Sequence, residues 1–80
     1  MDIRQLAAFV AVFEERNITA AAQRLFVSQP TLSATVRQLE ESLGTELFVR
    51  QPRGVDVSEA ARTLYPRARA CLLYTSDAAD

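Results

Sequence analysis

The stretch SQPTLSATVRQLEESLG, residues 28–44, predicts an amphipathic helix whose two ends are marked by their residue types. Ser28 is a good N-cap because its hydroxyl can accept a hydrogen bond from a free N–H group of the first turn. Pro30 follows in that turn, where a missing backbone N–H costs nothing. Gly44 suits the left-handed conformation in which many helices end. A helix between Ser28 and Gly44 is therefore expected.

The spacing of residues within this helix separates two faces. Apolar residues recur at intervals of four, three and four, and so lie in a narrow arc that faces a core: Leu32, Val36, Leu39 and Leu43. Because each residue turns the helix by about 100°, small and polar side chains gather on the opposite side. They are Pro30, Ala34, Arg37 and Glu41, with Ser33 at the shoulder. The outward face is therefore polar and shallow.

Two further helices are predicted before this one. The first covers residues 3–15, with apolar residues spaced by three and four: Ile3, Leu6, Phe9, Val10 and Phe13. The second, about eight residues long, follows the N-cap Asn17. It carries an apolar run of alanines that ends in Leu25 and Phe26, and the alanines let another helix approach closely. The second and third helices, joined by a tight turn around Val27, form a helix-turn-helix.

Residues 47–57 predict a β-hairpin. Proline at the second and glycine at the fourth position of the sequence QPRG suit a type I turn, which places Arg53 at the tip. An isolated hairpin is marginal in water. Phe48 and Val57 are therefore expected to pin it to the helices.

A last helix is predicted from Glu59, with Ser58 as its cap. Pro66 lies inside this helix and is expected to bend it. One side carries an apolar series that we expect to pair two chains: Ala61, Leu64, Tyr65, Ala68 and Leu72.

The predicted fold is mainly α: a winged helix-turn-helix with a two-stranded wing and a C-terminal linker helix. Residues 1–58 would form the DNA-binding domain and residues 59–80 the linker or dimerisation helix. Such a fold can place its third helix in the major groove of DNA, which is about 12 Å wide.

The outward face of the third helix supplies candidate DNA contacts. The N-terminus of this helix, at Ser28, can hold a phosphate of the DNA backbone, and Pro30 lies in the same first turn. Gln29 can pair with adenine through two hydrogen bonds, Ser33 can reach either a donor or an acceptor, and Thr31 can touch phosphate or a thymine methyl group. Two arginines are candidate phosphate contacts: Arg37 and the wing residue Arg53.

Several of these candidates also have a structural interpretation. Taken alone, Gln29 and Ser33 would be ordinary surface polar residues. Arg37 could pair with Glu40 or Glu41 on its own helix, and Arg53 could be a solvated turn residue. The acidic pairs Glu14-Glu15 and Glu40-Glu41 are interpreted as solvated faces, because neighbours in a helix point about 100° apart and cannot share a substrate.

Composition argues against an enzyme. The sequence has no histidine and a single cysteine, Cys71, which removes most nucleophile–base pairs and transition-metal sites and any internal disulfide. It also has no glycine-rich phosphate loop. No metal and no cofactor are therefore expected. No apolar stretch approaches the roughly 20 residues that cross a bilayer, so no membrane contact is expected, and the predicted location is the cytoplasm, at the bacterial nucleoid.

The net charge of −1 neither supports nor excludes DNA binding. All nine basic residues are arginine, against ten acidic residues. Two of those acids, Asp77 and Asp80, lie in the last ten residues, and without them nine basic residues face eight acids. DNA-binding domains usually carry net positive charge. The prediction of function therefore depends on the sequence pattern.

The ordered pattern resembles the N-terminal domain of the LysR-type transcriptional regulators over residues 1 to about 70. The matching residues are Leu6, Phe9, Val12, Ala21-Ala22, Leu25, Ser28-Gln29-Pro30-Thr31-Leu32-Ser33, Leu39-Glu40, Leu43-Gly44, Leu47-Phe48 and Arg50. The resemblance implies a winged helix-turn-helix that contacts bases and backbone through Gln29, Pro30, Thr31 and Ser33. It also implies a linker helix that pairs two subunits into a homodimer.

The chain departs from the family pattern in several places. Ala34 stands where arginine is frequent, Arg16-Asn17 where Gly-Ser is frequent, and Ala61 where the linker helix usually has glycine. Family members continue into a ligand-sensing α/β domain, which the 80-residue sequence does not include. No small-molecule ligand is therefore expected for this chain. Residues 71–80 resemble translated sequencing-adapter read-through, and the hypothesis is a truncated or chimeric reading frame.

Two functions are therefore weighed. The first is sequence-specific DNA binding and transcriptional regulation as a homodimer on a roughly palindromic site. The alternative is an interaction module whose last helix pairs with another helical chain, forming inactive heterodimers without DNA contact. The salt dependence of binding separates them, because phosphate contacts weaken steeply with ionic strength.

Overall fold

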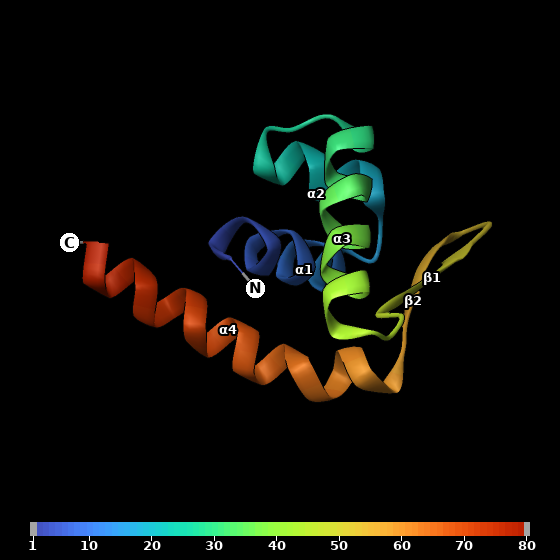
Figure 1. Ribbon diagram of the computed structural model, residues 1–80. Coiled ribbons are helices and arrows are strands. Elements are labelled where there is room, and N and C mark those ends of the chain that lie inside the picture. Colours follow the sequence, from blue (N-terminus) through green and yellow to red (C-terminus); the bar gives the residue numbers. More distant parts are fainter. Residues whose placement is uncertain (1, 80) are drawn as a thin grey trace.

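Four helices and one β-hairpin make up the part of the chain that the structure describes (Figure 1). The computed structural model describes the backbone of residues 2–79 and the side chains of residues 2–73. In chain order the elements are α1 (Ile3–Glu15), α2 (Ile18–Leu25), α3 (Gln29–Leu43), β1 (Phe48–Gln51), β2 (Gly54–Val57) and α4 (Glu59–Ala79). The predicted fold, a mainly helical winged helix-turn-helix, is confirmed. The hypothesis about residues 71–80 falls largely on side chains outside the described residues.

The predicted caps are present at the helix ends. The Ser28 side chain accepts a hydrogen bond from the Thr31 N–H (3.2 Å), and Asn17 accepts one from the Ala20 N–H (2.9 Å). Gly44 ends α3 in the left-handed conformation, with a φ of 70°. Two ends differ from the usual glycine pattern, because Arg16 and Phe26 also adopt positive φ, 55° and 58°. Each of these residues closes its helix by donating its backbone N–H to the preceding turn.

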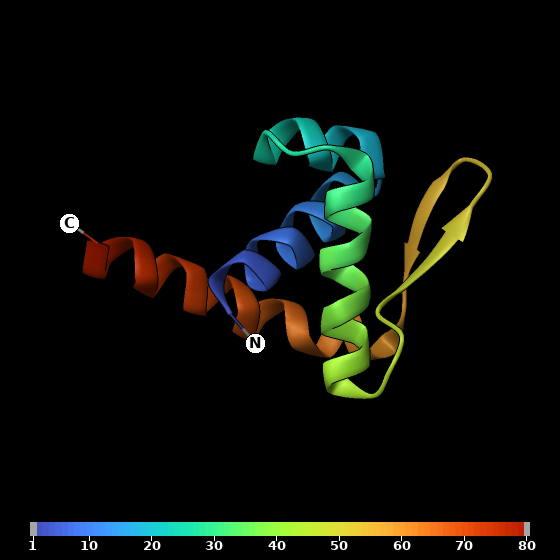
Figure 2. The ribbon, with the colours of Figure 1, turned by 45° about the horizontal axis from the view of Figure 1, so that its top comes forward.

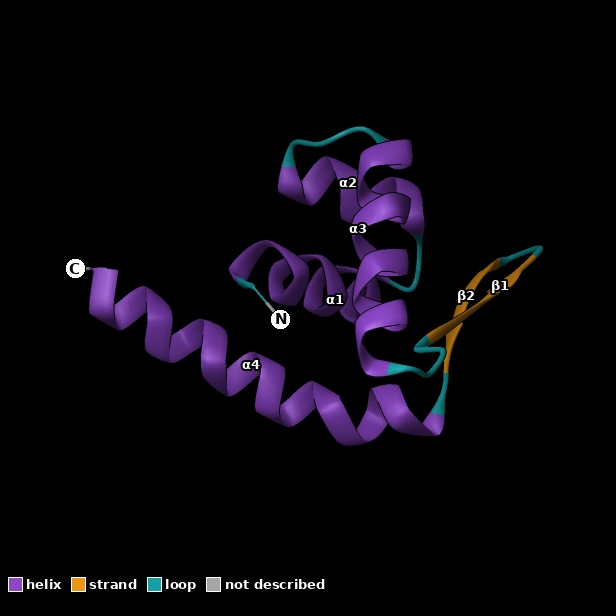
Figure 3. Cartoon of the chain, in the orientation of Figure 1, coloured by secondary structure: helices purple, strands orange, loops and turns teal. Residues whose placement is uncertain are grey.

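Helix α1 is central to the core, with α2 and α3 on one side and α4 on the other (Figure 3). One core cluster joins α1 to α3, the wing and α4: Leu6, Phe9, Val10, Leu39, Leu47, Val57, Ala61 and Ala68. A second cluster joins α1 to α2, α3 and the wing: Ala8, Ala11, Val12, Ala21, Ala22, Leu32, Val36 and Val55. The core therefore fixes α3 from its buried side and leaves the opposite side to solvent.

Three residues that the pattern placed among apolar faces are exposed. Leu43 is 42% exposed because it lies one turn beyond Leu39, where α3 has passed the end of the core. Ile3, at the first residue of α1, is 50% exposed. Phe26 is 93% exposed, because its left-handed backbone at the end of α2 turns the ring outward. The prediction that Leu43 faces the core was therefore wrong, and the apolar patterns of α1 and α2 extend beyond the buried residues at Ile3 and Phe26.

The wing is held to the helices through both strands. Phe48 pairs with Val57 across the antiparallel hairpin, and the Phe48 ring lies 5.5 Å from that of Phe9. Val57 is buried, so the predicted pinning by Phe48 and Val57 is confirmed. Sequence reasoning missed a further attachment: Val55 is also buried and donates its N–H to the Arg16 carbonyl (3.0 Å).

Gly54 allows this attachment. Its φ is 145°, and a Cβ atom added there would lie 2.6 Å from the Arg16 carbonyl oxygen. A side chain at this position would therefore meet both an unfavourable backbone conformation and a close backbone atom.

Helix α4 continues through Pro66 to Ala79 and packs its apolar side against α1. Ala61 and Ala68 are 0% and 1% exposed. Leu64, Tyr65 and Leu72 are partly buried against the same cluster. The series that we expected to face a second chain therefore contributes to the core of its own chain.

Candidate nucleic-acid interface

The outer side of α3 and the neighbouring wing form one exposed surface. Figure 2 shows α3 along one side of the molecule with the hairpin beside it. The side chains of Ser28, Gln29, Pro30, Thr31 and Arg37 are exposed, and Ser33 is half-buried on the side of the wing. The candidates predicted on this helix therefore lie on an accessible face, around the first turns of α3.

Local hydrogen bonds fix the first turn of α3. The Ser28 hydroxyl caps the Thr31 N–H and donates its own proton to the Thr31 hydroxyl oxygen (2.9 Å). Thr35 donates its hydroxyl to the Thr31 carbonyl (2.9 Å). Because the Thr31 hydroxyl already accepts a bond from Ser28, its own proton remains available to an outside acceptor such as a phosphate oxygen.

Arg50 links the wing to α3. Its Nη2 donates to the Ser33 hydroxyl oxygen at 2.5 Å. Both side chains line a cleft of about 90 Å³ between α3 and the hairpin, together with Arg37, Glu40 and Phe48. The sequence pattern included Arg50 as part of a family match but gave it no role, because residue spacing does not reveal a bond between positions 17 residues apart.

Arg53 lies at the hairpin turn, as predicted, and its side chain is exposed. With Arg50 it lines a second, open cleft of about 320 Å³ between the wing and the start of α2, where Asn17 and Thr19 are found. The structure thus brings Ser33 and Arg37 to one cleft and Arg53 to the other, with Arg50 in both.

Glu40 is partly buried beside this site, and its carboxylate accepts hydrogen bonds from the backbone N–H groups of Leu47 (2.7 Å) and Phe48 (3.1 Å). Glu40 therefore fixes the start of β1 against α3. The interpretation of the pair Glu40-Glu41 as a solvated face was wrong for Glu40, because this carboxylate satisfies two backbone donors.

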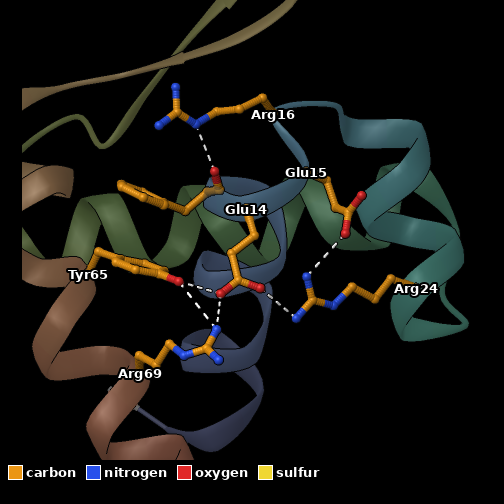
Figure 4. A network of polar contacts seen from close by, with 7 residues as sticks. Glu14, Glu15, Arg16, Arg24, Tyr65 and Arg69 are labelled. Carbon is orange, nitrogen blue, oxygen red and sulfur yellow. Dashed lines mark hydrogen bonds and ion pairs between the residues drawn. The ribbon is translucent and has the colours of Figure 1, made fainter.

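Glu14 joins three helices at the back of the helix-turn-helix (Figure 4). Its carboxylate forms an ion pair with Arg24 of α2 (2.8 Å) and accepts hydrogen bonds from Tyr65 and Arg69 of α4. The Tyr65 ring stacks on Phe13 with centroids 4.1 Å apart. The interpretation of Glu14 as a solvated residue was wrong, because its carboxylate is bonded to Tyr65 and Arg69. These partners lie 51 and 55 residues further along the chain, so local spacing does not reveal them.

The environment of Glu14 lowers its pKa. Partial burial alone would raise the pKa, but hydrogen bonds from Tyr65 and Arg24 and the positive charges of Arg24 and Arg69 together outweigh it. A lowered carboxyl pKa contributes stability above the ordinary value of 4.5, and this contribution is lost as the pH falls through the lower, folded-state pKa.

We expect Glu14→Gln to lower the free energy of unfolding by about 1 kcal/mol at pH 7, because the neutral amide loses the ion pairs with Arg24 and Arg69. The loss is small because solvent screens these partly exposed arginines. The difference from the parent chain should narrow as the pH falls from 4.5 toward the lower folded-state pKa, because Glu14 becomes protonated first in the unfolded chain and then in the folded chain. Urea unfolding followed by circular dichroism at several pH values measures this. Glu46→Gln, at an exposed residue, is the matched control; a difference that stayed constant down to pH 3 would contradict the assignment.

Comparison with known proteins gives a consistent result. Residues 3–62 match the family described as bacterial regulatory helix-turn-helix protein, lysR family. The HTH-type transcriptional regulator BudR of Klebsiella aerogenes is 49% identical over 80 residues, and ClcR of Pseudomonas putida is 47% identical over 75 residues. These matches cover 99% and 94% of this chain but only 54% and 26% of the two relatives. The chain thus spans about half of one relative and a quarter of the other.

Solved structures share the fold. A crystal structure of the CbnR DBD in complex with DNA superimposes with a TM-score of 0.93 at 39% identity, covering 100% of this chain and 92% of that one. The structure of CbnR, described as a LysR family transcriptional regulator, gives the same TM-score and identity with 28% of its chain covered. Among the described residues, no helix has the length and apolar character to span a membrane, and no three metal-binding side chains gather.

Proposed function

Because this chain belongs to the LysR family of bacterial regulatory helix-turn-helix proteins, we propose that it binds double-stranded DNA at preferred sequences and regulates transcription. The observation that carries the proposal is the exposed polar face of α3 beside a wing with two arginines. The CbnR DBD, a chain of nearly the same extent and fold, is solved on DNA. The relatives BudR and ClcR of the present chain are described as transcriptional regulators. We further propose that the chain acts in the bacterial cytoplasm, at the nucleoid.

In this proposal α3 enters the major groove with its first turns. Gln29 and Ser33 face base edges, and Pro30 packs beside them. Ser28 and Thr31 lie at the helix N-terminus, where N–H groups and the Thr31 hydroxyl can hold a phosphate. Arg37 and the wing residue Arg53 supply further positive charge that contacts the phosphate backbone of the DNA.

The alternative, a pairing module that does not touch DNA, is not favoured. It relied on the apolar side of α4, and that side is largely occupied by the core of the same chain. A pairing module would also give no reason for the polar, exposed face of α3.

Sequence preference is tested by binding the chain to a pool of random duplexes containing inverted repeats, followed by sequencing of the bound fraction. We expect enrichment of one half-site, arranged with two-fold symmetry. Equal recovery of all sequences, or no binding at low salt, would refute the proposed function.

Gln29 and Arg53 are expected to contribute differently to DNA binding. Gln29→Ala should cost about 1 to 3 kcal/mol on the preferred site and little on random DNA, because it removes base contacts. Arg53→Ala should weaken binding to all sequences and lower the slope of log K against log salt by about 1. Fluorescence anisotropy titrations at several salt concentrations measure both effects.

Gln38→Ala is the matched control for Gln29→Ala. Gln38 is exposed on the same helix but lines a different hollow, on the side of α1. It should leave specific affinity unchanged. Identical losses from Gln29→Ala and Arg53→Ala, on specific and random DNA alike, would show that the division into base and phosphate contacts is wrong.

We also propose that two chains pair through α4. Ala61 and Ala68 are enclosed by their own core, so the contribution of the predicted series is restricted to its partly buried members Leu64, Tyr65 and Leu72. The adjoining Leu73, 58% exposed, adds apolar surface on the same helix. Figure 2 shows that the C-terminal end of α4 extends beyond the other helices.

Leu73→Glu is expected to raise the dimer dissociation constant about tenfold, because a charge would have to be buried at the contact. Sedimentation velocity over a range of concentrations measures the constant. Gln23→Glu, at an exposed residue of α2, is the charge-matched control. A monomer at all concentrations, or equal constants for both variants, would count against pairing through α4.

A further inference from the structure

The bond between Arg50 and Ser33 has a defined direction. A guanidinium carries only hydrogen-bond donors, so the Ser33 oxygen must be the acceptor in the 2.5 Å contact. Arg50 reaches it from β1 of the wing, whereas Ser33 belongs to α3. One side chain of the candidate recognition face is therefore already engaged by a second element.

This bond changes what the Ser33 hydroxyl can do next. A free serine hydroxyl has one proton to donate and two lone pairs that accept, and so it can bond to base donors and base acceptors alike. With a guanidinium on one lone pair, the oxygen is polarised and its remaining proton becomes a better donor. A further N–H donor approaching the same oxygen would also meet the positive charge of Arg50.

We propose that Arg50 is a specificity-determining residue that makes Ser33 a hydrogen-bond donor toward DNA. This inference rests on the proposed function, in which α3 lies in the major groove. As a donor, Ser33 can bond to the base edges that present an acceptor in the major groove: guanine N7 and O6, adenine N7 and thymine O4. Cytosine, which presents only its N4 amino group, is disfavoured at that position.

Position and exposure make this assignment testable. Arg50 is exposed, and its side chain is outside both core clusters, so its replacement should leave the fold intact. Arg50→Met removes every donor but keeps a long side chain. Arg50→Lys keeps the positive charge and a donor, and serves as the conservative variant.

The experiment measures base preference with the 80-residue chain. Ser33→Ala first identifies the base pair that Ser33 reads, as the position where preference is lost in competition binding against single-base operator variants. At that pair the parent chain should disfavour cytosine. Arg50→Met should reduce this discrimination about fivefold, the value of one hydrogen bond of about 1 kcal/mol. Arg50→Lys should retain most of it, and Arg50→Met added to Ser33→Ala should change the preference no further.

The opposite outcomes are distinct. If Arg50→Met weakens all sequences equally, lowers the salt slope by about 1 and leaves the preference at the Ser33 position unchanged, Arg50 is a phosphate contact and the inference is wrong. If the parent chain disfavours no base at that position, the inference is also wrong while sequence-specific binding stands. If the parent chain selects no sequence at all, the proposed function itself fails. Circular dichroism of each variant confirms that the fold is retained.

Discussion

Phe9→Ala is expected to lower the free energy of unfolding by about 3 to 5 kcal/mol, the usual cost of removing a fully buried phenylalanine ring. Phe9 is 0% exposed. Its ring lies 5.9 Å from that of Phe13 and 5.5 Å from that of Phe48, so one cavity would disturb both the helical core and the base of the wing. A chain of 80 residues is stabilised by only about 4 to 12 kcal/mol in total, and the variant should therefore be near its unfolding limit.

Urea and thermal unfolding followed by circular dichroism measure this loss. The chain supplies a matched control in Phe26→Ala, because the same side chain is 93% exposed there. That variant should differ from the parent by no more than about 0.5 kcal/mol. Comparable losses at the two phenylalanines would show that Phe9 is not a central core residue.

Gly54→Ala is expected to cost about 2 to 3 kcal/mol and to weaken DNA binding. The backbone conformation at φ 145° is costly for any residue with a Cβ. The added methyl group would also lie 2.6 Å from the Arg16 carbonyl oxygen, which accepts the Val55 N–H. The Arg16 carbonyl is a backbone group and cannot rotate away as a side chain could, so the strand that carries Gly54 must move. Arg50 and Arg53 on the same hairpin would move with it.

Gly44→Ala tests whether steric contact, rather than positive φ alone, causes the loss. Gly44 has a φ of 70° with nothing within 4 Å of an added Cβ, so its replacement should cost only about 1 kcal/mol and leave DNA affinity nearly unchanged. Unfolding curves and anisotropy titrations of both variants make the comparison. Equal effects on DNA binding would argue against the attachment of the wing at Arg16.

The third helix could be predicted from the sequence because its signals are local. The Ser28 cap, the proline of the first turn and Gly44 mark ends that lie within a few residues of the bonds they make. The hairpin followed in the same way from its turn residues. Periodicity also gave the buried side of α3, but it contains no information on where the core ends, and so Leu43 was misplaced.

The parts that could not be predicted depend on contacts between distant positions. Glu14 meets Tyr65 and Arg69 only after α4 has folded back along α1, and Arg50 meets Ser33 only when the wing lies beside α3. The apolar series of α4 illustrates a further limit. A stripe at helical spacing looks the same whether it faces its own core or a second chain, and here Ala61 and Ala68 face their own core.

The packing of α4 on α1 has a consequence for synthesis on the ribosome. Helix α1 is translated before α4. The residues that cover Phe13 and complete the cluster around Phe9, Tyr65 and Ala68 among them, therefore follow much later in synthesis. Native contacts between such distant segments can form only after the intervening chain has been made. We therefore expect the nascent chain to keep this apolar face of its first helix uncovered, and available to a chaperone, until α4 leaves the exit tunnel.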